Sequence, residues 1–210
     1  MTRAIGVDVS SVQSKIDYVK LATAVDFLIP KFSEGRWYDP CGLKHLEGAR
    51  KAGLIVPVVD HVLSVRSTAA DQAKVAIAAA KDHGVHVVLD WEIGPANVDA
   101  ATEFAASITA EGLRCVWYSY PYFVQTATKL APAKVSELVS HCEWWGATYH
   151  DERVAPTETA APWIPQDYVG DWTFWQWSGN NGTSSPGISS VVDHDVFYGD
   201  RDELLAWAEI

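Results

Sequence analysis

The sequence predicts a single-domain α/β protein, a barrel related to the TIM type in which five strand–helix units precede three strands. Two observations carry this prediction. The first half alternates apolar, strand-like segments with helix-like segments, whereas strand-like segments after residue 140 follow one another without long helices. The chain has 210 residues, 48% of them hydrophobic and 20% charged. One domain with a full core, covering residues 1–210, fits this length.

Five strand–helix units account for the first 130 residues. The clearest helix is predicted over 68–83, where Thr68 and Asp71 resemble a capping box and Gly84 ends the helical pattern. Pro30 weakens the prediction of the second strand, because proline has no backbone N–H to donate to a neighbouring strand. The predicted strands cover 4–9, 27–32, 54–62, 85–91 and 113–119, and the helices 17–24, 40–52, 68–83, 97–110 and 122–130.

The alternation of strands and helices stops in the second half of the chain. Strands are predicted over 144–149, 172–177 and 191–197, with a last helix over 202–208. The proline-rich segment 151–170 is predicted to be a loop. In barrels of parallel strands, chemistry takes place at the carboxyl ends of the strands, so the residues that end each strand are the first candidates for function.

Composition excludes several classes of partner. The net charge of −11, without any basic cluster, argues against a nucleic-acid partner. No apolar run approaches the roughly 20 residues that span a bilayer, so no membrane insertion is expected. No secretory signal peptide is expected at the start of the chain. Three well-separated cysteines, Cys41, Cys115 and Cys142, are expected to be reduced. No metal and no cofactor is predicted, and the chain is expected to be a monomer.

Two carboxylates follow the fourth strand. Asp90 and Glu92 are spaced i, i+2, so they point to the same side, and crowding there keeps a proton on one of them to higher pH. Such a group can serve as a general acid near neutrality, although a lone D-x-E is more often a strand end that meets solvent. The other strand ends add acids and aromatics, namely Asp8, Lys31, Glu34, Asp60, His61, Tyr118, Tyr120, Trp145, Tyr149, Gln176, Trp177 and Asp193. Convergent carboxylates with aromatic walls indicate a glycoside hydrolase. The chain also holds 10 tryptophans, at least one of which is expected to stack on a sugar ring.

An ordered set of motifs resembles the family 25 glycoside hydrolases, the Chalaropsis-type lysozymes found among phage endolysins. The opening 6–13 resembles the family's G-x-D-x-S-x-x-Q start, and 16–18 its following I-D-W. Segment 27–35 resembles the second strand ending in K-x-x-E-G, and 89–92 carries the D-x-E motif. Segments 145–149, 172–178, 186–188 and 192–197 resemble the W-x-A-x-Y and W-Q-Y-S…G-I…V-D-x-N-x-F patterns. The matches span almost the whole chain in order.

The resemblance implies a modified (β/α)5(β)3 barrel that cuts peptidoglycan. The implied bond is the β-1,4 link from N-acetylmuramic acid to N-acetylglucosamine, cleaved with retention. Glu92 would be the acid/base, and Asp90 would orient the substrate N-acetyl group or stabilise the cation. Asp8 and Asp193 match the family's other active-site acids. Residues expected to bind substrate are Lys31, Asp60, His61, Tyr118, Trp145, Tyr149, Gln176 and Trp177. The i, i+2 pair favours substrate assistance over a protein nucleophile.

Three positions depart from the family pattern. Asp60 replaces a sugar-facing aromatic and adds a carboxylate to an acidic pocket, which bears on substrate fit and pH optimum. Trp177 replaces a tyrosine, and Asp195 stands where the family has asparagine. His61 is interpreted either as a pH-sensitive pocket residue or as a hydrogen-bonded structural histidine.

Three functions remain open from the sequence. The leading hypothesis is a muramidase acting on bacterial peptidoglycan, as a phage endolysin held in the host cytoplasm until holin-dependent release or as a virion-associated wall hydrolase. A catalytically weakened, glycan-binding barrel is the second, and Asp60 is its best support. A chitinase-like glycosidase using the same D-x-E chemistry is the third. No separate wall-binding module is apparent in the sequence.

Overall fold

Eight strands close into a barrel, as predicted. The computed structural model describes residues 2–95, 97–130, 132–149, 156, 159–162, 164, 171–179 and 183–209. The barrel strands are β1 (Ile5–Val9), β2 (Phe27–Glu34), β4 (Val58–Val62), β5 (His86–Asp90), β6 (Cys115–Ser119), β7 (Cys142–Ala147), β8 (Trp172–Ser178) and β9 (Asp193–Phe197). They pair in the order β1-β9-β8-β7-β6-β5-β4-β2, and a β1–β2 pairing closes the ring.

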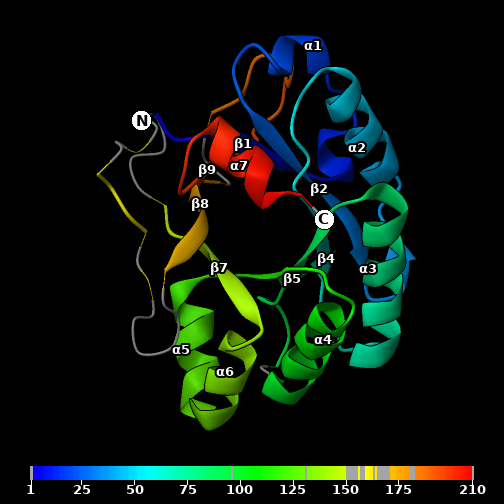
Figure 1. Ribbon diagram of the computed structural model, residues 1–210, viewed down its shortest axis with the longest axis vertical. Helices are drawn as coiled ribbons and strands as arrows, with labels where there is room; N and C mark the ends of the chain where they lie inside the picture. The colour runs from blue at the N-terminus through cyan, green and yellow to red at the C-terminus, as the bar shows by residue number, and fades with distance from the viewer. Residues whose placement is uncertain are drawn as a thin grey trace.

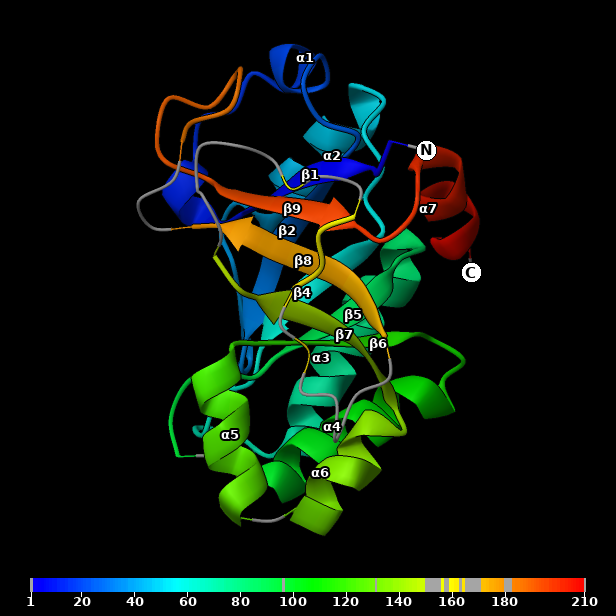
Figure 2. The ribbon, with the colours of Figure 1, turned by 90° about the vertical axis from the view of Figure 1, so that its left-hand side faces the viewer.

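Helices cover the first five strands and leave the last three without long helical cover (Figures 1 and 2). In Figure 2, β7, β8 and β9 face the viewer, with α5 and α6 at the foot of the view. The helices are α1 (Tyr18–Leu21), α2 (Gly42–Lys51), α3 (Ala69–His83), α4 (Val98–Ala110), α5 (Pro121–Leu130), α6 (Pro132–Val139) and α7 (Arg201–Trp207), with a 3₁₀ turn η1 at Ser11–Gln13. No helix of these described ranges is long and apolar enough to cross a bilayer.

The direction of β9 brings two distant acids together. β9 runs antiparallel to both β1 and β8, whereas the other barrel pairings are parallel. Asp193 begins β9 and is the register partner of Asp8, near the end of β1. The start of β9 therefore lies beside the carboxyl ends of the parallel strands, where barrel enzymes place their chemistry.

The opposite end of the barrel is filled with apolar side chains. Trp207 of α7 packs on Phe174 and Phe197 with ring centroids 5.3 and 6.1 Å apart. Most tryptophans are also structural: Trp91, Trp117 and Trp144 are at most 1% exposed and belong to the main hydrophobic core. Burying side chains of this size is a leading source of stability and leaves the carboxyl ends of the strands for polar groups.

Helix boundaries follow the local signals. Thr68 Oγ1 accepts a hydrogen bond from the amide of Asp71 at the start of α3, and Gly84 ends the helix with φ of 57°. Pro30 lies within β2, where its register partner is Val9 of β1. The three cysteines are free.

The elements α6, β3 and η1 were not predicted, and several predicted strands are shorter, β4 most of all. α6 follows α5, and β3 (Trp37–Tyr38) forms a tight hairpin with β2 outside the closed ring. β4 begins at Val58, because Ile55 makes only an isolated bridge to Phe27. Most of the predicted loop 151–170 lies outside the described residues.

Candidate active site

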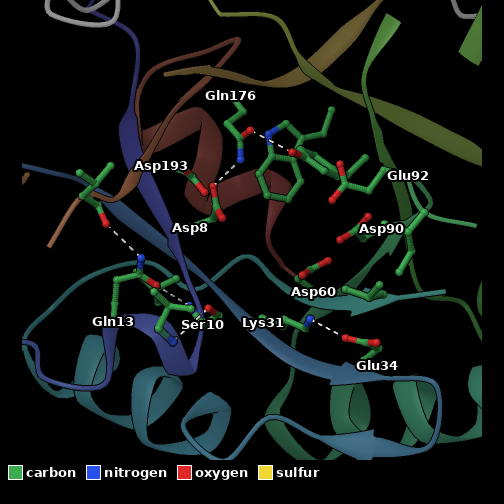
Figure 3. Close-up of a pocket in the computed structure, with 17 residues that line it drawn as sticks. Asp8, Ser10, Gln13, Lys31, Glu34, Asp60, Asp90, Glu92, Gln176 and Asp193 are labelled. Atoms are coloured by element: carbon green, nitrogen blue, oxygen red, sulfur yellow. Dashed lines mark hydrogen bonds and ion pairs between the residues drawn. The ribbon is translucent and has the colours of Figure 1, made fainter. Parts of the chain in front are cut away.

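A cavity of about 440 Å³ opens at the carboxyl ends of the parallel strands (Figure 3). Six carboxylates line it, and Lys31 is the only lysine or arginine among the lining residues that the structure describes. The lining acids are Asp8, Glu34, Asp60, Asp90, Glu92 and Asp193. Two opposed groups form its sides, which we name the Glu92 wall (Lys31, Asp60, Asp90 and Glu92) and the Asp8 wall (Asp8, Gln176, Asp193 and Asp195, with Trp145).

The Glu92 wall comes from β2, β4 and the end of β5. Asp90 is the last residue of β5, and both Asp90 and Glu92 line the cavity, as their i, i+2 spacing predicts. Trp91 between them is 1% exposed and packs in the core. Asp90 is 7% exposed, and its buried Oδ1 has no hydrogen-bond partner among the described residues. A buried oxygen of this kind is available to a ligand.

Burial is the main cause of the raised pKa of Glu92. The charge of Asp193 across the cavity raises that pKa further, and Lys31 opposes the shift. Crowding by neighbouring acids, the cause expected from the sequence, is thus secondary to desolvation. Burial also raises the pKa of Asp60 to about 7 against the attraction of Lys31, while the charge of Glu92 adds to the rise. Lys31 Nζ lies 2.8 Å from Oε2 of Glu34.

Gln176 fixes the orientation of Asp8. Its Oε1 accepts hydrogen bonds from the hydroxyls of Tyr118 at 2.9 Å and Tyr149 at 3.2 Å. Two hydroxyl donors on one amide oxygen leave the Nε2 side to donate, and it donates to Oδ2 of Asp8 at 2.8 Å. The amide thus presents an N–H to the Asp8 carboxyl group and none to the tyrosines.

Asp8 and Asp195 form a buried carboxyl pair. Asp195 is 0% exposed, and its Oδ1 accepts the indole N–H of Trp145 at 3.0 Å. Its Oδ2 accepts no N–H or O–H from the described residues, and a proton on one of the two interacting carboxyl groups would relieve their mutual repulsion. Burial raises the pKa of both groups, with the charge of Asp193 adding to each rise. Burial also raises the pKa of Asp193 itself, to about 6.

The structure gathers most of the predicted site residues. The cavity is lined by Asp8, Lys31, Asp60, Asp90, Glu92, Tyr118, Trp145, Gln176 and Asp193. Tyr149 lies just beyond β7, and its hydroxyl reaches Gln176. Trp145 is the predicted sugar-stacking candidate that lines the cavity; Trp163 lies outside the described residues.

His61 and Trp177 are corrections to the sequence-based site. His61 is 0% exposed, bonds through Nδ1 to Ser33 Oγ at 2.7 Å, and stacks on Phe104 at 4.9 Å. Burial lowers its pKa to about 4, so it is the neutral structural histidine and not a pH-sensitive pocket residue. Trp177 packs with Trp175 in a separate cluster away from the cavity. Neighbouring residues of a strand point to opposite sides of the sheet. Because Asp60 and Gln176 face the cavity, the adjacent residues His61 and Trp177 face away from it.

Sequence reasoning left several lining residues out of the proposed site. Ser10, Gln13 and Glu34 line the cavity together with apolar residues at its rim, namely Val9, Val12, Val62, Ile93 and Val191. Gln13 Nε2 donates to the carbonyl of Val191 at 3.1 Å, which joins η1 to the segment before β9. The opening motif contains both Ser10 and Gln13, so the signal for them was present. The exposed rim residues carry no such signal, because isolated surface valines are common.

No three His, Cys, Asp or Glu side chains in the described part of the chain are placed to share a metal ion. The carboxylates are instead spread over two walls, with Lys31 and amide or indole donors among them. Carboxylic acids with raised pKa values beside ionised carboxylates can donate protons and stabilise positive charge on a substrate.

Comparisons with known proteins agree with this fold. A bacterial lysozyme from Streptomyces coelicolor superposes with a TM-score of 0.80 at 24% identity, covering 99% of this chain and 98% of its own. The catalytic domain of endolysin ply40 from bacteriophage P40 of Listeria monocytogenes gives 0.75 at 21% identity, covering 99% and 98%. A muramidase from Trichobolus zukalii gives 0.75 at 24%, covering 98% of each chain. No curated protein sequence matches this chain. The profile described as "Glycosyl hydrolases family 25" matches residues 7–186, and the chain therefore belongs to glycosyl hydrolase family 25.

Proposed function

We propose that this family 25 hydrolase cleaves the β-1,4 bond between N-acetylmuramic acid and N-acetylglucosamine in bacterial peptidoglycan, with retention. The observation that carries the proposal is Glu92, a partly buried acid with a raised pKa, beside Asp90 in a cavity lined by carboxylates. The names of the similar structures, a lysozyme, an endolysin and a muramidase, support the choice of substrate.

In the first step, Glu92 gives its proton to the glycosidic oxygen as the bond from that oxygen to C1 breaks. The substrate's own N-acetyl oxygen attacks C1 from the opposite face, giving a cyclic oxazolinium ion. In the second step, Glu92 takes a proton from a water molecule that attacks C1. The ring opens, the N-acetyl group is restored, and the configuration at C1 is retained.

Asp90 suits the task of orienting the N-acetyl group. Its unpartnered Oδ1 can accept the amide N–H of that group, which polarises the amide toward attack through its oxygen. Asp8 and Asp193 face Glu92 from the other wall (Figure 3) and would stabilise positive charge at C1. Trp145 lines the cavity but is only 2% exposed, so its role is to hold Asp195 through the indole N–H and not to offer a broad face to a sugar.

The test is hydrolysis of purified bacterial walls, followed by turbidity and by mass spectrometry of the products. The wild-type protein should clear the walls and leave new reducing ends on N-acetylmuramic acid. Reducing ends on N-acetylglucosamine would contradict muramidase action and favour the chitinase-like alternative. Loss of the N-acetyl group from the substrate should abolish cleavage, whereas a protein nucleophile would tolerate it.

A glycan-binding protein without hydrolysis is the second candidate, favoured by the extra carboxylate of Asp60 in the cavity. Sedimentation with walls would then show binding, while turbidity stayed constant for both wild type and Glu92→Gln. The same pair of measurements separates the two functions in one experiment.

We further propose an endolysin role, with the protein held in the bacterial cytoplasm until a holin opens the membrane. Support comes from the similarity to a phage endolysin domain. Cells that express the protein should remain intact until the membrane is permeabilised with chloroform, and then lyse rapidly. Lysis before permeabilisation, or its absence afterwards, would contradict this role.

A further inference from the structure

A second cavity of about 380 Å³ adjoins the active site. It is lined by Glu34, Gly35, Arg36, Trp37, Ser64, Arg66 and Ser67, and Glu34 also lines the catalytic cavity. We name it the arginine pocket. A third, smaller cavity shares Ser64 and Ser67 with the arginine pocket and Ile93 with the catalytic cavity, so the three adjoin along one side.

Neither arginine of this pocket has an ion-pair partner among the described residues. No salt bridge joins Arg36 or Arg66 to an acid of the described residues. Glu34, which lines the pocket, pairs with Lys31 at 2.8 Å, and Asp71, whose pKa the charge of Arg36 helps to lower, pairs with Lys74 at 3.4 Å. Two guanidinium groups without a contact ion pair among the described residues therefore line one pocket of a chain with a net charge of −11. They are suited to bind a carboxylate or phosphate, which an arginine contacts through two parallel N–H groups.

An exposed tryptophan completes the pocket. Trp37 is 81% exposed, although it lies on the short strand β3 and is held in register with Glu34 of β2. A large aromatic fixed in solvent on an ordered element is typical of a binding surface. The buried Oγ of Ser67, without a hydrogen-bond partner in the described part of the chain, adds a polar contact.

The loop that carries Arg66 is held in place by hydrogen bonds from the buried side chain of Gln72. The side chain of Gln72, 1% exposed, accepts from the amide of Ser64 at 2.7 Å and donates to the carbonyls of Ser64 and Ser67 at 2.8 and 3.0 Å. Its Oε1 also lies 3.4 Å from His61 Nε2. The buried His61 thus has a structural role here: it connects β2 and β4 to the floor of the arginine pocket.

The charge of the catalytic cavity explains why a separate anion site is needed. In peptidoglycan, the muramic acid residue carries a peptide with free carboxylates. Such carboxylates would be repelled by a cavity lined by six acids and one lysine. The arginine pocket, which shares the lining residue Glu34 with that cavity, offers the opposite charge.

We infer that the arginine pocket binds a carboxylate of the peptide attached to the glycan, with Arg36 and Arg66 as its ligands and Trp37 packed against the peptide. This inference rests on the proposed peptidoglycan substrate. It adds a specificity site that lies outside the catalytic cavity and acts on substrate affinity. Because the contact is made equally in the bound substrate and in the transition state, its loss should raise KM and leave kcat unchanged.

The experiment compares two soluble substrates that lack phosphate-containing polymers: glycan chains with their peptides, and the same chains after an amidase has removed the peptides. The Arg36→Gln/Arg66→Gln double variant should show about a tenfold higher KM on the peptide-bearing chains and no change on the bare chains. Lys20→Gln/Lys129→Gln is the matched control, since it removes the same charge from exposed positions of α1 and α5. It should behave as the wild type on both substrates.

A second measurement identifies the group that is bound. Wild-type protein acting on chains whose peptide carboxylates have been amidated should reproduce the KM of the arginine variant. Equal KM values for wild type and variant on peptide-bearing chains would overturn the inference. An equal rise in the KM of the variant on both substrates would also overturn it, because it would indicate a site that binds sugar. Tighter binding to phosphate polymers than to peptide-bearing chains would also overturn it. If the wild type cleaves neither substrate, the proposed function fails instead.

Discussion

The two walls of the active site hold their carboxylates in different ways. In the Glu92 wall, Lys31 supplies a positive charge that opposes the effect of burial on Asp60, Asp90 and Glu92. In the Asp8 wall, no lysine or arginine of the described lining residues contributes. There, the N–H donors of Gln176 and Trp145 offset the negative charge, and the raised pKa values of Asp8 and Asp195 lead us to expect a proton shared between the two. One wall thus balances charge with a cation, and the other balances it with protons and neutral donors.

This difference suggests a division of tasks. The Glu92 wall can keep one ionised acid and one protonated acid side by side, which proton transfer to a leaving group requires. The Asp8 wall is held by four hydrogen bonds: Gln176 accepts two tyrosine hydroxyls at Oε1 and donates one Nε2 N–H to Asp8, and Trp145 donates its indole N–H to Asp195. We expect substitution of Glu92 to change proton transfer and substitutions in the second wall to change the position of Asp8.

Glu92→Gln should have the largest effect. An amide of the same shape cannot donate the proton, so kcat/KM on purified walls should fall by roughly 10²–10⁴, the contribution of a general acid. Glu34→Gln is the matched control in the same cavity, since Glu34 is exposed and paired with Lys31. If Glu92→Gln were as active as Glu34→Gln, Glu92 would not be the general acid.

Asp195 tests the shared proton of the Asp8 wall. Asp195→Ala leaves the indole N–H of Trp145 buried without an acceptor, which costs roughly 1–3 kcal/mol, and leaves Asp8 without its neighbour. Activity should fall about tenfold or more. Asp195→Asn keeps an oxygen for Trp145 and offers an N–H to Asp8, so its activity should stay within a few-fold of wild type. The comparison is measured as kcat/KM with urea unfolding as the check on stability.

If Asp195→Asn were as damaging as Asp195→Ala, a shared proton would not be the basis of this wall. The pH profile provides a second readout. Asparagine removes the charge of Asp195, one of the causes of the raised pKa of Asp8, so the part of the profile that reports Asp8 should move to lower pH.

Two tryptophans on neighbouring strands test the inside of the barrel against its outside. Trp145→Phe removes the N–H that holds Asp195 and should lower kcat/KM about tenfold. Trp177→Phe, on the outer face of β8, should leave activity within about twofold, because the buried Nε1 of Trp177 has no partner in the described residues. A large loss of activity in Trp177→Phe without a loss of stability would show that Trp177 belongs to the active site.

Asp60→Asn should have the smallest effect on activity and a measurable effect on stability. The pKa of Asp60 is about 7 in the folded protein and near 3.8 when unperturbed. Between these values the native state holds a proton that the unfolded chain has lost, so stability decreases as pH rises from about 4 to about 7. The variant should therefore match wild type at pH 4 and exceed it at pH 8 by at least about 1 kcal/mol, given about 1.4 kcal/mol per pKa unit.

Unfolding in urea at both pH values gives this difference directly, and Asp82→Asn, an exposed acid on α3, is the control. A gain in stability at pH 4 that equals the gain at pH 8 would show that Asp60 is not the source of the pH dependence. The comparison also tests Lys31, because its attraction is what keeps the pKa of Asp60 from rising further.

The alternation of strands and helices was sufficient to predict the barrel, because apolar periodicity and helix caps are local signals. Thr68 and Gly84 mark α3 in the sequence and in the structure. Asp90 and Glu92 could likewise be placed on one side of a strand end from their spacing alone. Pro132 at the first position of α6 is a local helix-start signal that the prediction did not use, whereas the two-residue β3 exists only through its pairing with β2.

The sequence did not predict correctly which side of the barrel wall each residue faces. Asp60–His61 and Gln176–Trp177 are adjacent pairs, and strand alternation allows only one member of each pair to face the cavity. Alternation alone does not say which one, since that depends on the register with the next strand. The sequence by itself determined the strands, their order along the chain and the acids that end them. Tertiary structure decided which side chains enter the cavity and joined Asp8 to Asp195 across 187 residues, because burial and hydrogen bonding depend on neighbours in space.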